Sequence, residues 1–131
     1  MPRPEGDVAD TLVARADDDL SLIRAARDRR DIADSIVGFH AQQAAEKLLK
    51  AVLARRQVEY PFTHDLERLI ELVEESTGDS PPDAEAIAAL TPWAVAFRYG
   101  EQADEAMDHD VTLARLERLR DWVTRALRAR E

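Results

Sequence analysis

Side chains that can exchange protons or hold phosphate oxygens gather on one turn of a strongly helical segment, residues 36–55 (IVGFHAQQAAEKLLKAVLAR). At about 100° per residue, His40, Gln43 and Lys47 fall next to one another at the border of the apolar side of this predicted helix. An imidazole, an amide and an ammonium in this arrangement could hold an anionic ligand or a polar partner. The alternative interpretation is a solvated border with a structural histidine.

The other residues of this segment sort into two sides, as in an amphipathic helix. Small and aliphatic side chains form the apolar side: Val37, Ala41, Ala44, Ala45, Leu48, Ala51 and Val52. The polar side is predicted to carry Gln42, Gln43, Glu46, Lys47 and Lys50, and Glu46 and Lys50 have the i,i+4 spacing of an ion pair. Gly38 costs the helix about 1 kcal/mol relative to alanine. We therefore expect a neighbouring helix, or alternatively a ligand, to approach closely there.

A second histidine, His64, follows a proline-containing loop. Thr63 is predicted to cap a helix that has His64 and Asp65 in its first turn. A carboxylate in that turn suits the helix dipole, which is the structural interpretation. The functional hypothesis is that this helix begins close to His40 and brings two imidazoles together. Two histidines and a carboxylate can bind a metal, but nothing in the spacing requires it, and no metal site is predicted.

Arg98 and Tyr99 are predicted to lie at the end of a short helix, where the chain turns to cross the fold. Thr91 and the following proline have the residue types of an N-cap and a first helical position. Gly100 has the residue type of the position just after a helix end.

Composition and periodicity predict an all-α fold, a single-domain up-and-down bundle of about five helices. Of the 131 residues, 45% are hydrophobic but only 5% are aromatic and 4 are glycine, which favours close-packed helices over sheets. Residues 1–6 are predicted to be a flexible leader and residues 7–131 one helical domain. The helices are expected at about 7–30, 32–56, 63–77, 82–90, 91–99 and 109–129, with Asp108 as the last N-cap.

Charged residues outside the central helix receive simpler predictions. Residues 17–19, three consecutive aspartates, are placed on the exposed side of the first helix. Arg120 points to the apolar side of the last helix, so it must snorkel to the edge, meet an acid such as Glu117, or face a partner subunit. Four further arginines share the outer side of that helix with Trp122: Arg115, Arg118, Arg125 and Arg128. This strip could dock RNA or an acidic partner, or be an ordinary solvated face.

Several functions are disfavoured by composition. A formal net charge of −9 opposes non-specific nucleic-acid binding, so RNA is not an expected partner. The chain has no cysteine, no apolar signal core and no apolar run long enough for a membrane span, which predicts a cytoplasmic protein without membrane contact. No phosphate-cradling glycine loop and no zinc-ligand spacing is present, and no cofactor is predicted.

Three stretches of this sequence resemble the HEPN domain family (higher eukaryotes and prokaryotes nucleotide-binding) over roughly Ala9 to Leu127: FHAQQAAEKLLKA, Thr63-His64-Asp65-Leu66 and Arg98-Tyr99. Ribonucleases of this family are recognised by an arginine followed, after four to six residues, by a histidine. The positions that would carry this arginine are Ala33, Asp34 and Ser35 for His40; Gln57, Val58 and Glu59 for His64; and Gln102, Ala103 and Asp104 for His109. None is arginine, so no catalytic residue is predicted.

The resemblance therefore implies the non-nuclease branch, whose members are often encoded beside a minimal nucleotidyltransferase and associate with it, as in toxin–antitoxin pairs. It implies a homodimer that binds nucleotide, this nucleotidyltransferase partner, or both. The implied ligand cleft is lined by His40, Gln43, Lys47, His64 and Arg98, with Tyr99 beside it. Two alternatives stay open. One is a ribonuclease whose site brings Arg98 and a histidine together across a dimer, and the other is a purely structural helical dimer.

Overall fold

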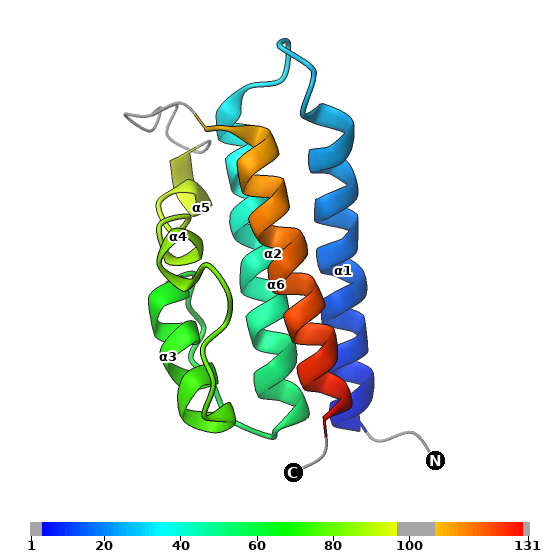
Figure 1. Cartoon of the computed structure of the whole chain (residues 1–131), viewed down its shortest axis with the longest axis vertical. Coiled ribbons are helices and arrows are strands. Elements are labelled where there is room, and N and C mark those ends of the chain that lie inside the picture. Colours follow the sequence, from blue (N-terminus) through cyan, green and yellow to red (C-terminus); the bar gives the residue numbers. More distant parts are fainter. Residues whose placement is uncertain (1–3, 97–106, 130–131) are drawn as a thin grey trace.

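The computed structural model describes residues 4–96 and 107–129, and no strand occurs in these ranges. The helices are α1 (Pro4–Ala26), α2 (Asp34–Arg55), α3 (Leu66–Thr77), α4 (Ala84–Ala88), α5 (Trp93–Ala96) and α6 (His109–Arg128). Figure 1 shows a bundle in which α1 runs up, α2 and α6 run down beside it, and both described chain ends lie at the same end. The predicted all-α bundle is confirmed.

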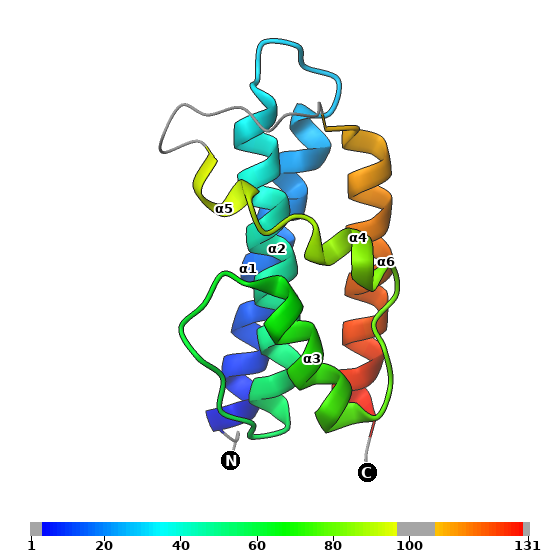
Figure 2. The same ribbon diagram turned by 90° about the vertical axis from the view of Figure 1, so that its left-hand side faces the viewer.

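Helix α2 is the centre of this bundle. It packs against α1, α3, α5 and α6. Figure 2 shows the short helices and their connections as a layer across α2 and α6, on the side away from α1. Twelve α2 residues are buried, most of them Ala, Leu or Val. Because alanine side chains are short, neighbouring helices can approach α2 closely on several sides.

Gly38 has the packing role expected of it. A Cβ atom added at Gly38 would lie 2.2 Å from Cε3 of the Trp93 indole, closer than real carbon atoms approach one another. Trp93 is buried at the start of α5. The glycine therefore makes room for the indole, and a neighbouring helix rather than a ligand explains it.

Two helix starts differ from the predictions. Helix α1 begins at Pro4 instead of near Asp7. Helix α3 begins at Leu66, because Asp65 is its N-cap and accepts a hydrogen bond from the backbone N–H of Glu67 (3.1 Å). The Thr63 hydroxyl accepts from the backbone N–H of Asp65 (3.0 Å) in the turn before the helix. Both side chains have capping chemistry, and the aspartate, two residues further on, takes the cap.

The short helices also differ in detail. Helix α4 covers only Ala84–Ala88 of the predicted 82–90. The Thr91 hydroxyl does not cap α5; it accepts a hydrogen bond from the backbone N–H of Leu66 (3.1 Å) and so ties α5 to the start of α3. Other predicted ends are confirmed. Gly78 adopts φ 73° after α3, and Asp108 caps α6 by accepting from the backbone N–H of Val111 (3.0 Å).

The three aspartates of α1 do not all face water. Asp19 is buried, with 6% of its surface exposed, and Asp17 is half-buried. Asp17 accepts two hydrogen bonds from Arg120 on α6, at 2.5 and 3.0 Å. Arg120 therefore meets an acid, as one prediction required, but the acid is Asp17 on α1. Glu117 pairs with Arg24 instead.

The outer face of α6 is less open than the sequence indicated. Trp122 is partly buried against the core. Arg118 donates to Asp83 at 2.8 Å, so part of the basic strip is already neutralised. None of the helices in the described part of the chain is both long and apolar enough to cross a membrane.

Candidate functional site

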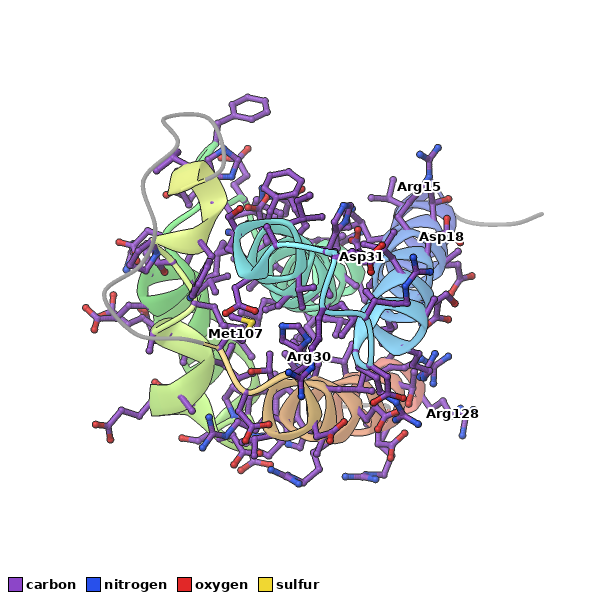
Figure 3. All side chains as sticks on the ribbon, turned by 90° about the horizontal axis from the view of Figure 1, so that it is seen from above. Arg15, Asp18, Arg30, Asp31, Met107 and Arg128 are labelled. Atoms are coloured by element: carbon purple, nitrogen blue, oxygen red, sulfur yellow. The ribbon has the colours of Figure 1, made fainter. Side chains whose placement is uncertain are left out.

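One line of α2 stays uncovered. Between residues 36 and 54, all of which are described, seven residues are not buried: Ile36, Phe39, His40, Gln43, Lys47, Lys50 and Ala54. Their three- and four-residue spacing places them on one side of the helix. Viewed along the bundle, none of the helices described in residues 4–96 and 107–129 lies over one side of α2 (Figure 3). We call these seven residues the α2 stripe.

The α1 edge of the stripe is built around Asp19. The ring Nδ1 of His40 lies 2.8 Å from one oxygen of Asp19, and the Lys47 ammonium donates to the other oxygen at 2.7 Å. The Asp19 side chain is only 8% exposed, against 30% for His40 and 26% for Lys47. A buried carboxylate is costly unless it is paired. Asp19 therefore fixes both predicted site residues in place and neutralises the positive charge of Lys47.

Asp19 was missed because it was assigned to the exposed side of α1. A signal was present, since Asp19 lies three residues after Ala16 and four before Ile23, both of which are fully buried. At the helical period these three residues share one face. The acidic neighbours at 17 and 18 obscured that pattern.

The other edge of the stripe is built around Glu46. Its Oε1 lies 2.7 Å from the ring Nδ1 of His64 and accepts from Gln42 Nε2 at 3.0 Å, and its Oε2 accepts from the Lys50 ammonium at 2.9 Å. The predicted Glu46–Lys50 pair is thus confirmed. Lys50 Nζ also lies 5.5 Å from the centre of the Tyr60 ring.

The pKa of Glu46 follows from its burial and from the groups that donate hydrogen bonds to it. Burial acts to raise the pKa of Glu46, but hydrogen bonds from His64, Lys50 and Gln42 together outweigh it and hold the pKa below its ordinary value of 4.5. The carboxylate is therefore ionised and fully engaged at neutral pH.

Gln42 and Glu46 were predicted on the polar side of the helix, and the structure buries both, with 0% and 7% exposed. The segment between α2 and α3 explains this. It passes beside α2 (Figure 2), and the backbone carbonyl of His64 accepts from Gln42 Nε2 at 3.0 Å. Helical periodicity within α2 does not reveal that a loop covers a polar position.

The predicted site residues are brought together only in part. His40 and Lys47 both contact the Asp19 carboxylate, whereas His64 contacts the Glu46 carboxylate. The two imidazoles are therefore held by different carboxylates. Gln43 lies between the two groups and donates to the side-chain oxygen of Gln42 at 2.8 Å. Arg98 and Tyr99 lie outside the described residues, as do Phe97 and Gly100. No group of three potential metal ligands occurs among the residues that the structure describes.

The amino-terminal end of the α2 stripe is apolar. Ile36 is 44% exposed, and the partly exposed Phe39 ring meets the His40 ring edge-on at 5.2 Å. Val95 on α5 is 40% exposed, and Phe62, in the segment between α2 and α3, is fully exposed. Large exposed apolar side chains beside rigid polar groups are typical of protein-binding surfaces.

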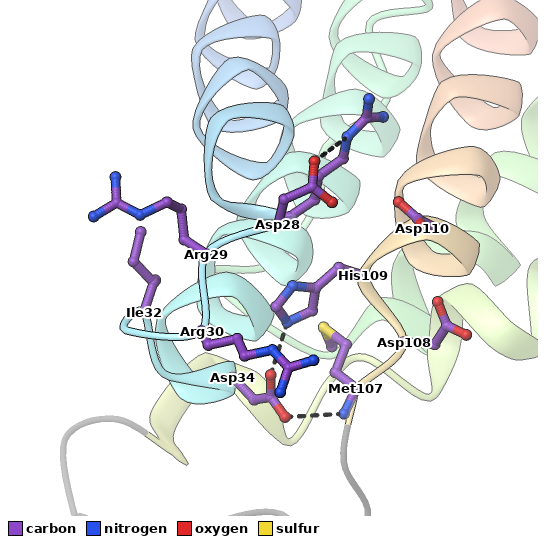
Figure 4. Close-up of a pocket in the computed structure, with 10 residues that line it drawn as sticks. Asp28, Arg29, Arg30, Ile32, Asp34, Met107, Asp108, His109 and Asp110 are labelled. Carbon is purple, nitrogen blue, oxygen red and sulfur yellow. Dashed lines mark hydrogen bonds and ion pairs between the residues drawn. The ribbon is translucent and has the colours of Figure 1, made fainter.

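The third histidine lies in a pocket of about 520 Å³ at the amino-terminal end of α2, where α6 begins (Figure 4). His109 Nε2 lies 2.7 Å from one oxygen of Asp34, and the other oxygen accepts from the backbone N–H of Met107 at 3.3 Å. Figure 4 shows the Arg30 side chain beside this pair. The lining mixes both signs of charge: Arg27, Asp28, Arg29, Arg30, Asp34, Asp108 and Asp110. With more acids than bases, the pocket is not suited to an anionic ligand.

Comparison with known proteins gives the family of the chain. The model of the HEPN domain family matches residues 9–127. No match was found among curated proteins or among solved structures. Because the match covers most of the sequence, the chain belongs to the HEPN domain family, and the resemblance seen in its motifs is confirmed.

Proposed function

We propose that this HEPN-domain protein is a non-catalytic binding module, and that its α2 stripe is the surface that takes up another protein. The expected partners are a second copy of the chain and, from the family resemblance, a minimal nucleotidyltransferase in a toxin–antitoxin type of pair. One observation carries the proposal: within the described part of the chain, the central helix is covered except along this stripe, where the exposed Ile36 and the partly exposed Phe39 lie beside fixed, neutralised polar groups.

A protein surface suits the stripe better than a free nucleotide does. A phosphate group needs cations that are not already paired. Lys47 is 2.7 Å from Asp19, and Lys50 is 2.9 Å from Glu46. A bound phosphate would have to compete with these two buried carboxylates and would lie close to their negative charge. Apolar side chains from a partner would instead cover Phe39 and Ile36 without disturbing either ion pair.

Thermal shift and native mass measurements with ATP, GTP and short RNA test this proposal. The wild type is expected to bind a second copy of itself or a co-purified nucleotidyltransferase. Its melting temperature is expected to stay the same when nucleotide is added. Lys47→Ala is the diagnostic variant, and Arg128→Ala, an exposed cation on α6, is its matched control. A nucleotide-dependent rise in melting temperature that Lys47→Ala alone abolishes would contradict the proposal and establish a nucleotide site.

The ribonuclease alternative requires an arginine and a histidine that meet at a phosphate. Each of the three histidines instead lies 2.7–2.8 Å from a carboxylate contributed by another part of the fold. We expect no RNA cleavage above background from cleanly purified protein. Cleavage that Arg98→Ala removes would show that the enzyme interpretation is correct.

A further inference from the structure

We infer that the carboxyl-terminal half of α6 carries a second binding site, which takes up an acidic peptide segment of a partner protein through one apolar anchor side chain. The site is a pocket of about 430 Å³ where the last turns of α6 adjoin the ends of α2 and α3 (Figure 2). We call it the α6 pocket. It lies outside the α2 stripe, so this inference does not rest on the proposed function.

The apolar part of the α6 pocket is built around the indole of Trp122, with Ala126 and Ala129 beside it. These three residues follow one another at intervals of four and three, which places them on one side of the helix. Trp122 packs against the core with part of its surface and is only partly buried. Because the two alanine side chains are short, they leave space next to the indole. An aromatic or aliphatic side chain of a partner can fill this space.

The indole N–H of Trp122 is available to a ligand. It has no hydrogen-bond partner among the described residues, and it is not one of the enclosed polar atoms of the bundle. Tryptophan Nε1 is a donor only, and it finds an acceptor when a partner buries it. A peptide that covers this indole should therefore bring an oxygen to it.

Two arginines line the α6 pocket, and they are held differently. Arg56 donates to the backbone carbonyl of Ser76 at 3.1 Å, which fixes its guanidinium at the end of α3. Arg125 is exposed and has no ion pair within the described part of the chain. Arg118 and Arg120 of the same helix, by contrast, are each paired with an aspartate. Arg125 can therefore take a carboxylate from a partner without giving up one of its own.

The charge balance of the α6 pocket favours an acidic ligand. Asp79 is the one acid among the described residues that line it, and its carboxylate accepts from the backbone N–H of Ser80 at 3.0 Å. Two arginines against one aspartate leave the lining positive. An arginine can hold a carboxylate through two parallel hydrogen bonds. An apolar anchor against Trp122 and a neighbouring carboxylate on Arg125 together specify an acidic peptide segment.

RNA suits this pocket less well than an acidic peptide does. Nucleic-acid affinity depends on several phosphates that are neutralised by Lys or Arg. The chain has a formal net charge of −9, and Arg118, further along α6, is already engaged by Asp83. A peptide segment needs only one or two carboxylates beside its anchor, so the small positive excess of the lining is sufficient for it.

A proton–nitrogen correlation spectrum tests this site directly, because the chain has two tryptophans, each with one indole N–H signal. The probe is a blocked pentapeptide, Glu-Asp-Phe-Asp-Glu. Its controls replace the phenylalanine by alanine or the four acids by lysine. We expect the probe to shift the Trp122 signal and to leave the signal of Trp93, which is buried against Gly38, in place. Both control peptides should give smaller shifts.

A charge reversal on α6 shows whether the pocket binds the probe. Arg125→Glu and Arg128→Glu make the same charge change on two exposed residues of one helix, but Arg128 does not line the α6 pocket. We expect Arg125→Glu to weaken the probe about tenfold and Arg128→Glu to weaken it less than about threefold, because only Arg125 contacts the peptide. Titration of the Trp122 signal measures both affinities, and circular dichroism checks that both variants fold.

The results that would overturn this inference are specific. They are a Trp122 signal that does not move at millimolar probe, equal affinities of the two arginine variants, or equal binding of the lysine peptide. A shift caused by short oligouridine and not by the probe would also overturn it, and would assign the pocket to RNA. Because Arg125 lies outside the α2 stripe, each of these results leaves the proposed function standing. That function fails separately, through a nucleotide effect lost in Lys47→Ala.

Discussion

Two parts of the bundle carry cations beside an aromatic side chain, the α2 stripe and helix α6, and they hold those cations differently. On α2, Lys47 and Lys50 pair with carboxylates that are 8–9% exposed. On α6, Arg118 pairs with Asp83 and Arg120 with Asp17, and the exposed fractions of these four side chains lie between 26% and 54%. Ion pairs on buried acids have fixed positions, whereas exposed pairs contribute little to stability. The α2 stripe is therefore the preorganised surface, although both regions look alike in sequence.

Removing one of the buried acids should cause the largest loss in the free energy of unfolding. Glu46→Ala leaves Lys50, Gln42 and His64 without their shared acceptor, and we expect a loss of about 3 kcal/mol in the free energy of unfolding. Urea denaturation measures it. Glu117→Ala, which breaks the exposed pair with Arg24, is the control and should cost less than about 1 kcal/mol. Equal losses in the two variants would remove the distinction between the regions.

Gly38→Ala should cause the next largest loss in the free energy of unfolding. This variant tests how closely α5 packs on α2. The new methyl group would overlap the Trp93 ring, and overpacking of this kind costs about 1–3 kcal/mol. The loss should shrink in a Trp93→Leu background, which a double-mutant cycle in urea measures. Gly38→Ala that is as stable as the wild type in both backgrounds would show that the indole is not held against α2.

The pH dependence of stability should distinguish Glu46 from exposed acids. The pKa of Glu46 is lower in the folded protein than its ordinary value of 4.5. Its stabilising contribution is therefore complete above about pH 5 and is lost as the pH falls through the folded-state pKa. The stability gap between wild type and Glu46→Gln should narrow as the pH falls below about 5 in urea titrations. A stability difference that stays constant as the pH falls would contradict the hydrogen bonds assigned from His64, Lys50 and Gln42 to Glu46.

Arg118→Ala should have the smallest effect on that same titration. Its hydrogen bond lowers the pKa of Asp83, but both side chains reach water and solvent screens the pair. We expect an unfolding curve close to that of the wild type at each pH. A pH-dependent loss as large as that of Glu46→Gln would mean that α6 also carries a rigid charged surface.

Elements set by local periodicity were predictable from the sequence. The apolar residues of α6 at Leu113, Leu116, Leu119 and Val123 are all buried, and the caps at Gly78 and Asp108 follow from residue type. The Glu46–Lys50 pair was predictable because both partners lie on one helix. In each case the deciding information lies within a few residues.

The parts of the site that were missed depend on distant contacts. Asp19 lies 21 residues from His40 and 28 from Lys47, and Asp17 lies 103 from Arg120. Gln42 and Glu46 are buried by a loop, so α2 alone does not indicate their environment. A helical pattern shows which side of a helix is apolar. It does not show which polar residues a neighbouring element will enclose.

Sedimentation of the wild type and of Phe39→Ser over a wide concentration range tests the central claim most directly. The claim is that the α2 stripe binds protein. We expect the 14.7 kDa chain to associate reversibly, and Phe39→Ser to remain folded by circular dichroism but associate at least about tenfold more weakly. Wild type and Phe39→Ser that associate equally, or a wild type that stays monomeric alone and with a nucleotidyltransferase partner, would contradict the claim.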